Sequence, residues 1–234
     1  MKINLDEYCL DTNIIITYLF EIEPNHILVK EFAKDSHNQM YYTEHIKEEI
    51  NKVIDNKINF ITTFLYDCIS ILNNYSDEFI NLEIFTSIII KNNKQYLYRN
   101  KKVYKKVKKD IIKSIWKRNN FYNVDIFQLR KVILEYVINL KRSTLIYKNN
   151  FLQKLILIPK HNESYKKVTS ILTKNNIHKE DMMIILDLCE YYDLKNNKLI
   201  FISFDKELIK ALKKCEFDFL KEVWNLKDLK SYVN

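Results

Sequence analysis

The chain has no glycine among its 234 residues. Glycine is needed where the backbone is left-handed or passes close to a ligand, as in the phosphate-binding loops of nucleotide-binding proteins, the loops of EF-hands and the nucleophile elbow of hydrolases. None of these sites can be present here in its standard form. If the protein acts on phosphate groups, it must do so with side chains, metal ions or the amino ends of helices.

Cysteine pairs and long apolar runs are also missing. The four cysteines are far apart and include no C-x-x-C pair, which argues against a zinc site or a disulfide framework. The longest apolar stretch, residues 14–20, is interrupted by Thr17 and is much too short to span a bilayer. Asp6 and Glu7 precede any apolar run, which argues against a signal peptide. We therefore expect a cytoplasmic protein with no membrane segment.

The positive charge is concentrated in one segment. The chain is +8 overall, yet residues 94–118 hold eleven Lys or Arg against one acid, and the remaining residues carry −2. Within the segment Tyr104, Val107, Ile111 and Ile115 recur at helical spacing, so it is predicted to form an amphipathic helix. A solvated helix face and a nucleic-acid-binding face both fit this pattern, and an anionic membrane surface fits it less well. The lysines of the expected binding face are Lys101, Lys102, Lys105, Lys106, Lys108, Lys109 and Lys113.

Hydrophobic residues make up 47% of the chain, enough for a sizeable core, and their pattern predicts strands that alternate with helices at both ends. Residues between about 55 and 175 look almost wholly helical. Six Asn-Asn pairs are candidates for helix ends and turns, because asparagine tolerates the left-handed conformation best after glycine. The expected strands are residues 8–10, 40–43, 199–203 and 217–223, and the expected helices are residues 13–20, about 26–34, from 44 onwards, 179–192 and 206–213. The pattern predicts an α/β fold with a parallel sheet flanked by helices.

Four acids stand where such a fold gathers functional groups. Asp11 and Asp205 each follow an expected strand, Glu49 lies on the helix after the second strand, and Asp181 opens a helix. In a parallel sheet these positions meet at one edge, where ligands bind. Converging carboxylates repel one another unless protons or cations lie between them, and Mg²⁺ or Mn²⁺ suits an all-oxygen set. Each acid taken alone is equally explained as a helix cap, a helix-dipole partner or an exposed helix residue.

The same four segments resemble the motifs of PIN-domain nucleases. Residues 10–15, Leu-Asp-Thr-Asn-Ile-Ile, look like the opening motif of that family. Residues 46–50 are similar to its second acidic helix and favour Glu49 over Glu48. Asp181 with the apolar residues after it resembles the third motif, and residues 201–208 resemble the last one, with Ser203 at the usual Thr or Ser position. The order and context agree for all four motifs.

This resemblance implies a single PIN-like domain over residues 1–234, built from 1–54 and 176–234 and carrying a basic helical insertion at about 55–175. It implies a metal-dependent endonuclease, most often acting on RNA, with single-stranded DNA as an alternative substrate. Two Mg²⁺ or Mn²⁺ ions would promote in-line attack of water on a phosphodiester. The catalytic, metal-binding residues would be Asp11, Glu49, Asp181 and Asp205, supported by Asn13 and Ser203, with Glu180 as a reserve acid.

Other functions stay open on the sequence alone. A catalytically silent PIN-like module that binds nucleic acid or protein would keep the fold without the chemistry, although all four acids are present. A haloacid-type phosphatase also begins with an Asp after a strand, but it requires a second Asp where this chain has Asn13. The sequence also leaves open a homodimer or an inhibitory protein partner.

Overall fold

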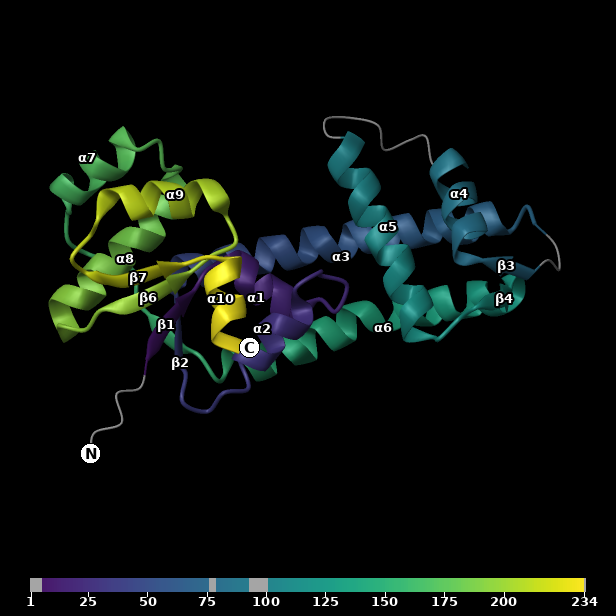
Figure 1. Ribbon diagram of the computed structural model, residues 1–234, viewed down its shortest axis with the longest axis horizontal. Coiled ribbons are helices and arrows are strands. Elements are labelled where there is room, and N and C mark those ends of the chain that lie inside the picture. The colour runs from purple at the N-terminus through teal and green to yellow at the C-terminus, as the bar shows by residue number, and fades with distance from the viewer. Residues whose placement is uncertain (1–5, 76–78, 93–100, 234) are drawn as a thin grey trace. The chain divides into compact units, whose positions relative to one another are not determined.

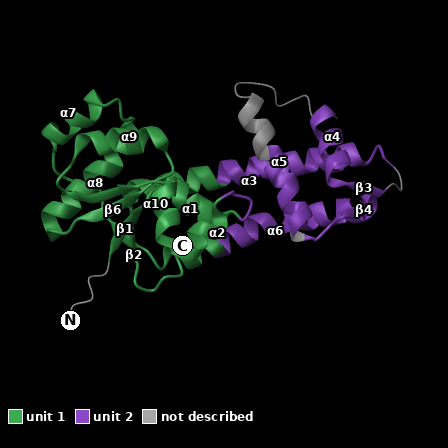
Figure 2. Ribbon diagram, viewed as in Figure 1, with its two compact units in different colours: residues 1–20, 25–54, 147–234 green, residues 21–24, 55–146 purple. Residues whose placement is uncertain are grey.

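The computed structural model describes residues 6–75, 79–92 and 101–233, and for residues 92, 101–107 and 118 it describes the backbone alone. The chain divides into two compact units (Figure 2). We call residues 1–20, 25–54 and 147–234 the sheet unit, and residues 21–24 and 55–146 the helical unit.

The sheet unit contains a five-stranded sheet in which every pair of neighbouring strands is parallel (Figure 1). The strand order is β5-β2-β1-β6-β7. Central strand β1 is buried from Tyr8 to Leu10, as expected for a strand covered on both faces. The strands are β1 (Glu7–Leu10), β2 (Gln39–Thr43), β5 (Ile156–Ile158), β6 (Leu199–Ile202) and β7 (Leu220–Trp224). The predicted α/β fold with a parallel sheet is confirmed.

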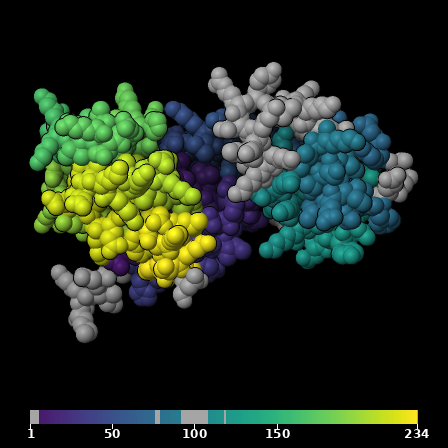
Figure 3. All heavy atoms as spheres, turned by 45° about the horizontal axis from the view of Figure 1, so that its top comes forward, coloured from purple at the N-terminus to yellow at the C-terminus, as the bar shows by residue number. Residues whose placement is uncertain are grey.

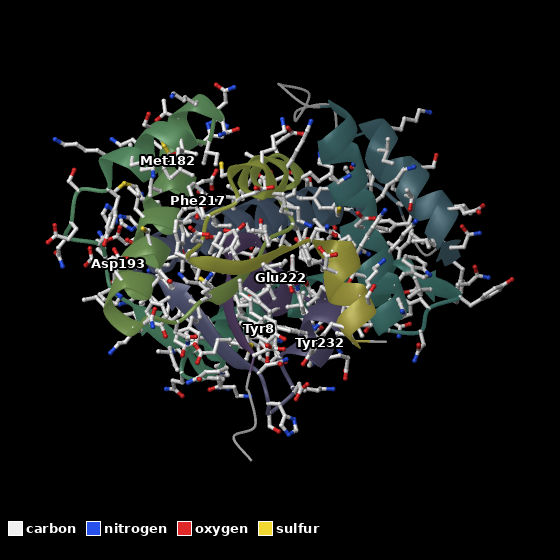
Figure 4. The ribbon with its side chains drawn as sticks, turned by 60° about the vertical axis from the view of Figure 1, so that its left-hand side comes forward. Tyr8, Met182, Asp193, Phe217, Glu222 and Tyr232 are labelled. Atoms are coloured by element: carbon white, nitrogen blue, oxygen red, sulfur yellow. The ribbon has the colours of Figure 1, made fainter. Side chains whose placement is uncertain are left out.

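Helices cover both faces of this sheet, with α7, α8 and α9 on one face and α1, α2 and α10 on the other (Figure 1). An aromatic cluster fixes the second face, because the Tyr8 ring of β1 packs against Phe32, Trp224 and Tyr232 at centroid distances of 5.1, 5.3 and 6.1 Å. Tyr8 and Tyr232 lie close together in Figure 4. The helices are α1 (Thr12–Leu19), α2 (His26–Phe32), α7 (Lys166–Lys174), α8 (Lys179–Lys195), α9 (Lys206–Cys215) and α10 (Leu226–Val233).

The strand order creates a switch point between β1 and β6. From β1 the chain adds β2 and then β5 on one side, and it returns to add β6 and β7 on the other side. Connections that leave two adjacent strands in opposite directions open a crevice at the carboxyl ends of those strands, where open α/β sheets bind ligands. Residues that follow Leu10 and Ile202 therefore lie at the favoured binding position of this sheet.

The helical unit is built from helices and one small antiparallel hairpin, β3 (Phe79–Asn81) with β4 (Asn123–Asp125). Its core includes Phe85, which stacks on Trp116 at 5.7 Å, and Phe64, which is 1% exposed. The helices are α3 (Glu44–Leu72), α4 (Leu82–Asn92), α5 (Lys101–Arg118) and α6 (Ile126–Leu152). The residues of α3 and α6 are divided between the helical unit and the sheet unit.

Asparagine takes the conformations that glycine usually supplies. Three of the four described residues with a positive φ are Asn120, Asn176 and Asn196, with φ between 50° and 55°. Each follows or closes a helix, which confirms the expected use of these Asn-Asn pairs. The pair at 149–150 is different, since it lies inside α6. The fourth residue is Glu216, the left-handed cap of α9.

Two features depart from the expected arrangement. Strand β5 lies in the stretch that was predicted to be helical, and residues 147–175 belong to the sheet unit. The three-residue strand is too short to show a period of two, and it is recognised only by its pairing with β2. The β3–β4 hairpin was missed for the same reason.

Within the described residues, no helix is both long and apolar enough to cross a bilayer.

Candidate metal site at the edge of the sheet

Asp11 lies directly after β1 and is 5% exposed. Its Oδ1 accepts a hydrogen bond from the Thr12 backbone N–H at 2.7 Å, so it also caps α1. Its Oδ2 accepts bonds from the Ser203 hydroxyl at 2.5 Å and from Asn13 Nδ2 at 2.6 Å. The local fold therefore holds one carboxylate rigidly at the switch point between β1 and β6.

Asn13 and Ser203 join the ends of β1 and β6 around this carboxylate. Asn13 Nδ2 also donates to Ser203 Oγ at 3.1 Å, and Asn13 Oδ1 accepts the backbone N–H of Phe204 at 2.9 Å. Ser203 is fully buried, and its Oγ accepts the backbone N–H of Asp205 at 3.0 Å. Because Asn13 and Ser203 bond to Asp11 and to the loop that carries Asp205, they set the orientation of both acids.

The other three acids come from three different elements. Glu49 lies on the second turn of α3, and its Oε2 accepts the Thr12 hydroxyl at 2.6 Å. Asp181 lies in the first turn of α8 and is half-buried, and its carboxylate makes no hydrogen bond to any residue in the described part of the chain. Asp205 precedes α9, where its Oδ1 accepts the N–H groups of Glu207 and Leu208 at 2.8 and 3.1 Å.

The charges of neighbouring acids act on the ionisation of Asp11 and of Asp181. The pKa of Asp11 is raised to about 7, chiefly by burial and also by the charges of Asp181 and Glu49, against the lowering effect of the hydrogen bonds from Ser203 and Thr12. The pKa of Asp181 is raised to about 6, chiefly by burial and also by the charges of Asp205 and Glu49. All four acids singled out from the sequence therefore lie in one electrostatic cluster.

Two of these acids cap helices, as the alternative explanation from the sequence proposed, but capping does not prevent them from also binding a metal ion. Asp11 and Asp205 each cap a helix with Oδ1. A carboxylate has two oxygens and about four acceptor positions, so capping leaves coordination capacity on the same side chain. For Asp181 the burial and the missing hydrogen-bond partner are not explained by a favourable helix dipole alone.

The two neighbouring acids have other surroundings. Glu48 is exposed, its Oε1 binds the ammonium of Lys160 at 2.6 Å, and that hydrogen bond lowers its pKa. Glu180 is also exposed. Glu49 is exposed as well, but its carboxylate accepts the Thr12 hydroxyl, and its charge and that of Asp181 raise the pKa of the buried Asp11.

The donor set of the cluster fits hard divalent cations. Its members offer carboxylate oxygens, which suit Mg²⁺ and Mn²⁺, whereas zinc prefers histidine and cysteine ligands. Two observations support the fit, since Asp181 has no hydrogen-bond donor among the described residues and Asp11 carries a pKa raised partly by its acidic neighbours. A cation would supply the positive charge that both groups lack.

Comparisons with known proteins do not identify the chain. No protein-family model, no curated protein and no solved structure matches it. The chemistry of the cluster must therefore be inferred from its own residues.

A second polar cluster was not expected from the sequence. His45 Nδ1 and His161 Nδ1 each lie 2.7 Å from one oxygen of Asp187, which is fully buried on α8. Because an ionised carboxylate only accepts, both imidazoles donate, and the backbone N–H of His161 donates as well at 3.0 Å. This network ties the loop after β5 and the first turn of α3 to α8. It thereby fixes the helix that carries Glu49, one turn after His45.

His45, His161 and Asp187 could also bind a metal ion, because each has a possible ligand atom and these atoms lie within 4.8 Å of one another. One sequence signal pointed to this cluster, since Asp187 is a single acid in the apolar run 184–189. Buried acids are uncommon unless they are paired. The two histidines gave no such signal, because their separations of 142 and 26 residues from Asp187 follow no local period.

The basic helix α5 is only partly described. The side chains of Lys101, Lys102, Lys105 and Lys106 lie outside the described residues. Lys113 is exposed and Lys109 is half-buried. Lys108 differs from the expectation of an exposed basic face: it is 8% exposed, its ammonium lies over the Phe64 ring at 5.3 Å, and burial lowers its pKa. It packs in the helical unit because it falls next to the apolar stripe that contains Ile111.

Proposed function

We propose that the protein is a Mg²⁺- or Mn²⁺-dependent endonuclease of the PIN-like kind that acts on RNA. One observation carries the proposal: four carboxylates from four separate elements cluster at the switch point of a parallel sheet, around an Asp11 whose pKa is raised to about 7. Asp11 is buried and Asp181 is half-buried, and placing carboxylates there beside the exposed Glu49 and Asp205 is costly for folding unless cations bind, so the cluster indicates a function.

The residues of the chain have distinct roles in this proposal. Asp11, Asp181, Asp205 and Glu49 would hold the ions, and the bound ions supply the charge that stabilises the attacking and leaving oxygens of a phosphodiester. Asn13 and Ser203 hold Asp11 by hydrogen bonds to its Oδ2. Thr12 holds Glu49 through its hydroxyl, so Asp11 and Glu49 keep their positions when the substrate enters.

Positive charge outside the site supports a nucleic acid as the substrate. The chain is +8 overall, and the strongly basic residues 94–118 include α5 of the helical unit. Phosphate contacts from lysine give affinity that does not depend on sequence. We propose that this unit is an insertion in a PIN-like domain that holds the backbone of RNA, with single-stranded DNA as the alternative substrate. A silent binding module is the competing function, and it predicts binding without cleavage.

The proposal is tested with labelled RNA and single-stranded DNA, incubated with purified protein in Mn²⁺ or in chelator. Wild type should cleave in Mn²⁺ and should not cleave in chelator. Glu49→Gln should lower the cleavage rate by roughly 10- to 100-fold, a loss typical of a removed charged group that supports a metal site. Glu48→Gln is the matched control. Glu48 is next to Glu49 in the chain, but its carboxylate pairs with Lys160, so this variant should cleave like wild type.

Two results would contradict this assignment. Equal losses in the Glu48 and Glu49 variants would show that the helix, and not the carboxylate, matters. RNA binding by wild type without any metal-dependent cleavage, on RNA or on DNA, would favour the silent module.

A further inference from the structure

A cavity lies beside the acidic cluster, and its walls change character from one end to the other. It has a volume of about 380 Å³ and is lined at one end by Asp181 and Asp205. Its other walls come from the turn between α7 and α8 and from one side of α9. Figure 3 shows α7 and α9 side by side on the surface of the sheet unit. The cavity and the proposed cation site therefore share two carboxylates.

Two lysines of α9 add positive charge to the cavity, which is also lined by His178 and, nearer the start of α9, by Glu207. Lys210 and Lys214 are one helical turn apart, so both lie on the same side of α9, and both line the cavity. Both are exposed, and neither forms an ion pair with another residue in the described part of the chain. Lys213, between them, does not line the cavity and instead lies 3.5 Å from a carboxylate oxygen of Asp228.

Other lining residues offer both apolar and polar surface. Ile177 and Leu208 are 7% and 5% exposed and present apolar surface to the cavity. Asn175 and Asn176 add amide groups, and Asn175 uses its Nδ2 on the carbonyl of Ile171, which leaves its Oδ1 as an acceptor. Apolar walls with a few polar groups are typical of small-molecule sites, and this volume is near the lower end of their range of about 300–1,000 Å³.

We propose that this cavity binds one unpaired nucleotide of the substrate strand, next to the phosphate that is cleaved. Its base packs on Ile177 and Leu208, and its phosphate contacts Lys210 and Lys214. The cleaved phosphate then lies at Asp181 and Asp205, where the cations are held. This inference rests on the proposed nuclease function and adds a substrate class, because a base inserted in the cavity cannot remain in a duplex.

Charge favours a nucleotide strand over a neutral ligand. The acids at one end require cations, and cations attract a phosphate to that end. The ammonium groups of Lys210 and Lys214 lie farther along α9 than Asp205 and Glu207, and they suit a second phosphate. A strand with phosphates on both sides of a base fits this order of charges, and a neutral metabolite does not.

The test compares the double variant Lys210→Gln/Lys214→Gln with Lys213→Gln in steady-state cleavage of a short single-stranded RNA in Mn²⁺. All three lysines are exposed on the same helix, so the variants should fold alike. The double variant should raise KM about tenfold with kcat nearly unchanged, since charge-assisted contacts to a phosphate are lost. Lys213→Gln should match wild type. A nucleoside monophosphate should compete with the RNA in wild type and much less well in the double variant.

The failures of the two proposals are distinguishable. If wild type cleaves RNA and the double variant has the KM of Lys213→Gln, the nucleotide site is overturned and the nuclease function stands. If wild type does not cleave, RNA binding measured by fluorescence anisotropy of the labelled RNA in Mn²⁺ tests the nucleotide site independently of the nuclease function. Weaker binding in the double variant only would support it, and equal binding in all three proteins would overturn it. Equal cleavage of the same sequence held in a stable duplex would contradict the unpaired nucleotide.

Discussion

Asp11→Asn is expected to lower the rate of RNA cleavage in Mn²⁺ by on the order of 10³-fold or more. The substitution keeps the shape of the side chain but removes the charge at the centre of the acidic cluster. Metal ions contribute several kcal/mol to stabilising the charge of the transition state, and each 1.36 kcal/mol corresponds to a factor of ten in rate. Asp181→Asn should have a similar effect, because its carboxylate has no competing hydrogen bond among the described residues.

The matched control for this prediction is Glu180→Gln. Glu180 precedes Asp181 in the first turn of α8 but is exposed, so its variant should retain nearly full activity. Far-ultraviolet circular dichroism of each variant shows whether the fold is kept. Turnover at the wild-type rate by pure Asp11→Asn protein would refute the role of Asp11 in a metal site.

Without metal, the protein should lose stability as the pH rises from about 4 to about 7. The folded-state pKa of Asp11 is about 7 and that of Asp181 about 6, both above the ordinary value of 3.8. The folded state therefore binds more protons than the unfolded state in this range, and stability falls as pH rises through it. For the buried Asp11, a rise from 3.8 to about 7 corresponds to roughly 4 kcal/mol.

Urea unfolding in chelator at several pH values measures this effect, with Asp11→Asn as the comparison. The variant has no charge at this position, so it should be more stable than wild type at about pH 8 and should depend less on pH. Part of the gain is offset, because an amide has a single acceptor oxygen and cannot accept both from the Thr12 N–H and from Asn13 and Ser203, as the two carboxylate oxygens do. Identical pH dependence in the two proteins would show that Asp11 does not carry a raised pKa.

The elements around the site could be predicted because their signals are local. Strand β1, the apolar helix after Asp11 and the left-handed residues Asn176 and Asn196 at the ends of α7 and α8 depend on short stretches of residues. The carboxylates could be placed at one edge because parallel strands end together. The structure adds the hydrogen bonds by which Ser203 and Asn13 join two strands separated by 190 residues, and no local pattern could show their geometry.

The features that were missed depend on contacts between distant segments. Strand β5 has three residues, two of them exposed, and exists through its pairing with β2. The cluster around Asp187 joins α3, α8 and the loop after β5, which are unrelated in sequence. Lys108 was expected on the exposed face because its charge was weighed above its place beside the apolar stripe, and its aliphatic chain packs inside instead.

The most direct measurement of the central claim is a set of melting curves at about pH 7.5, for wild type and Asp11→Asn, each in chelator and in Mn²⁺. A cation that binds the folded site alone stabilises it by about 2.7 kcal/mol at a hundred times its dissociation constant. For a chain of this size we expect wild type to melt roughly 5–10 °C higher in Mn²⁺. The rise should be much smaller in Asp11→Asn. If the melting temperature of wild type does not change across millimolar Mn²⁺, the four acids do not form a metal site, and the proposed nuclease function is wrong.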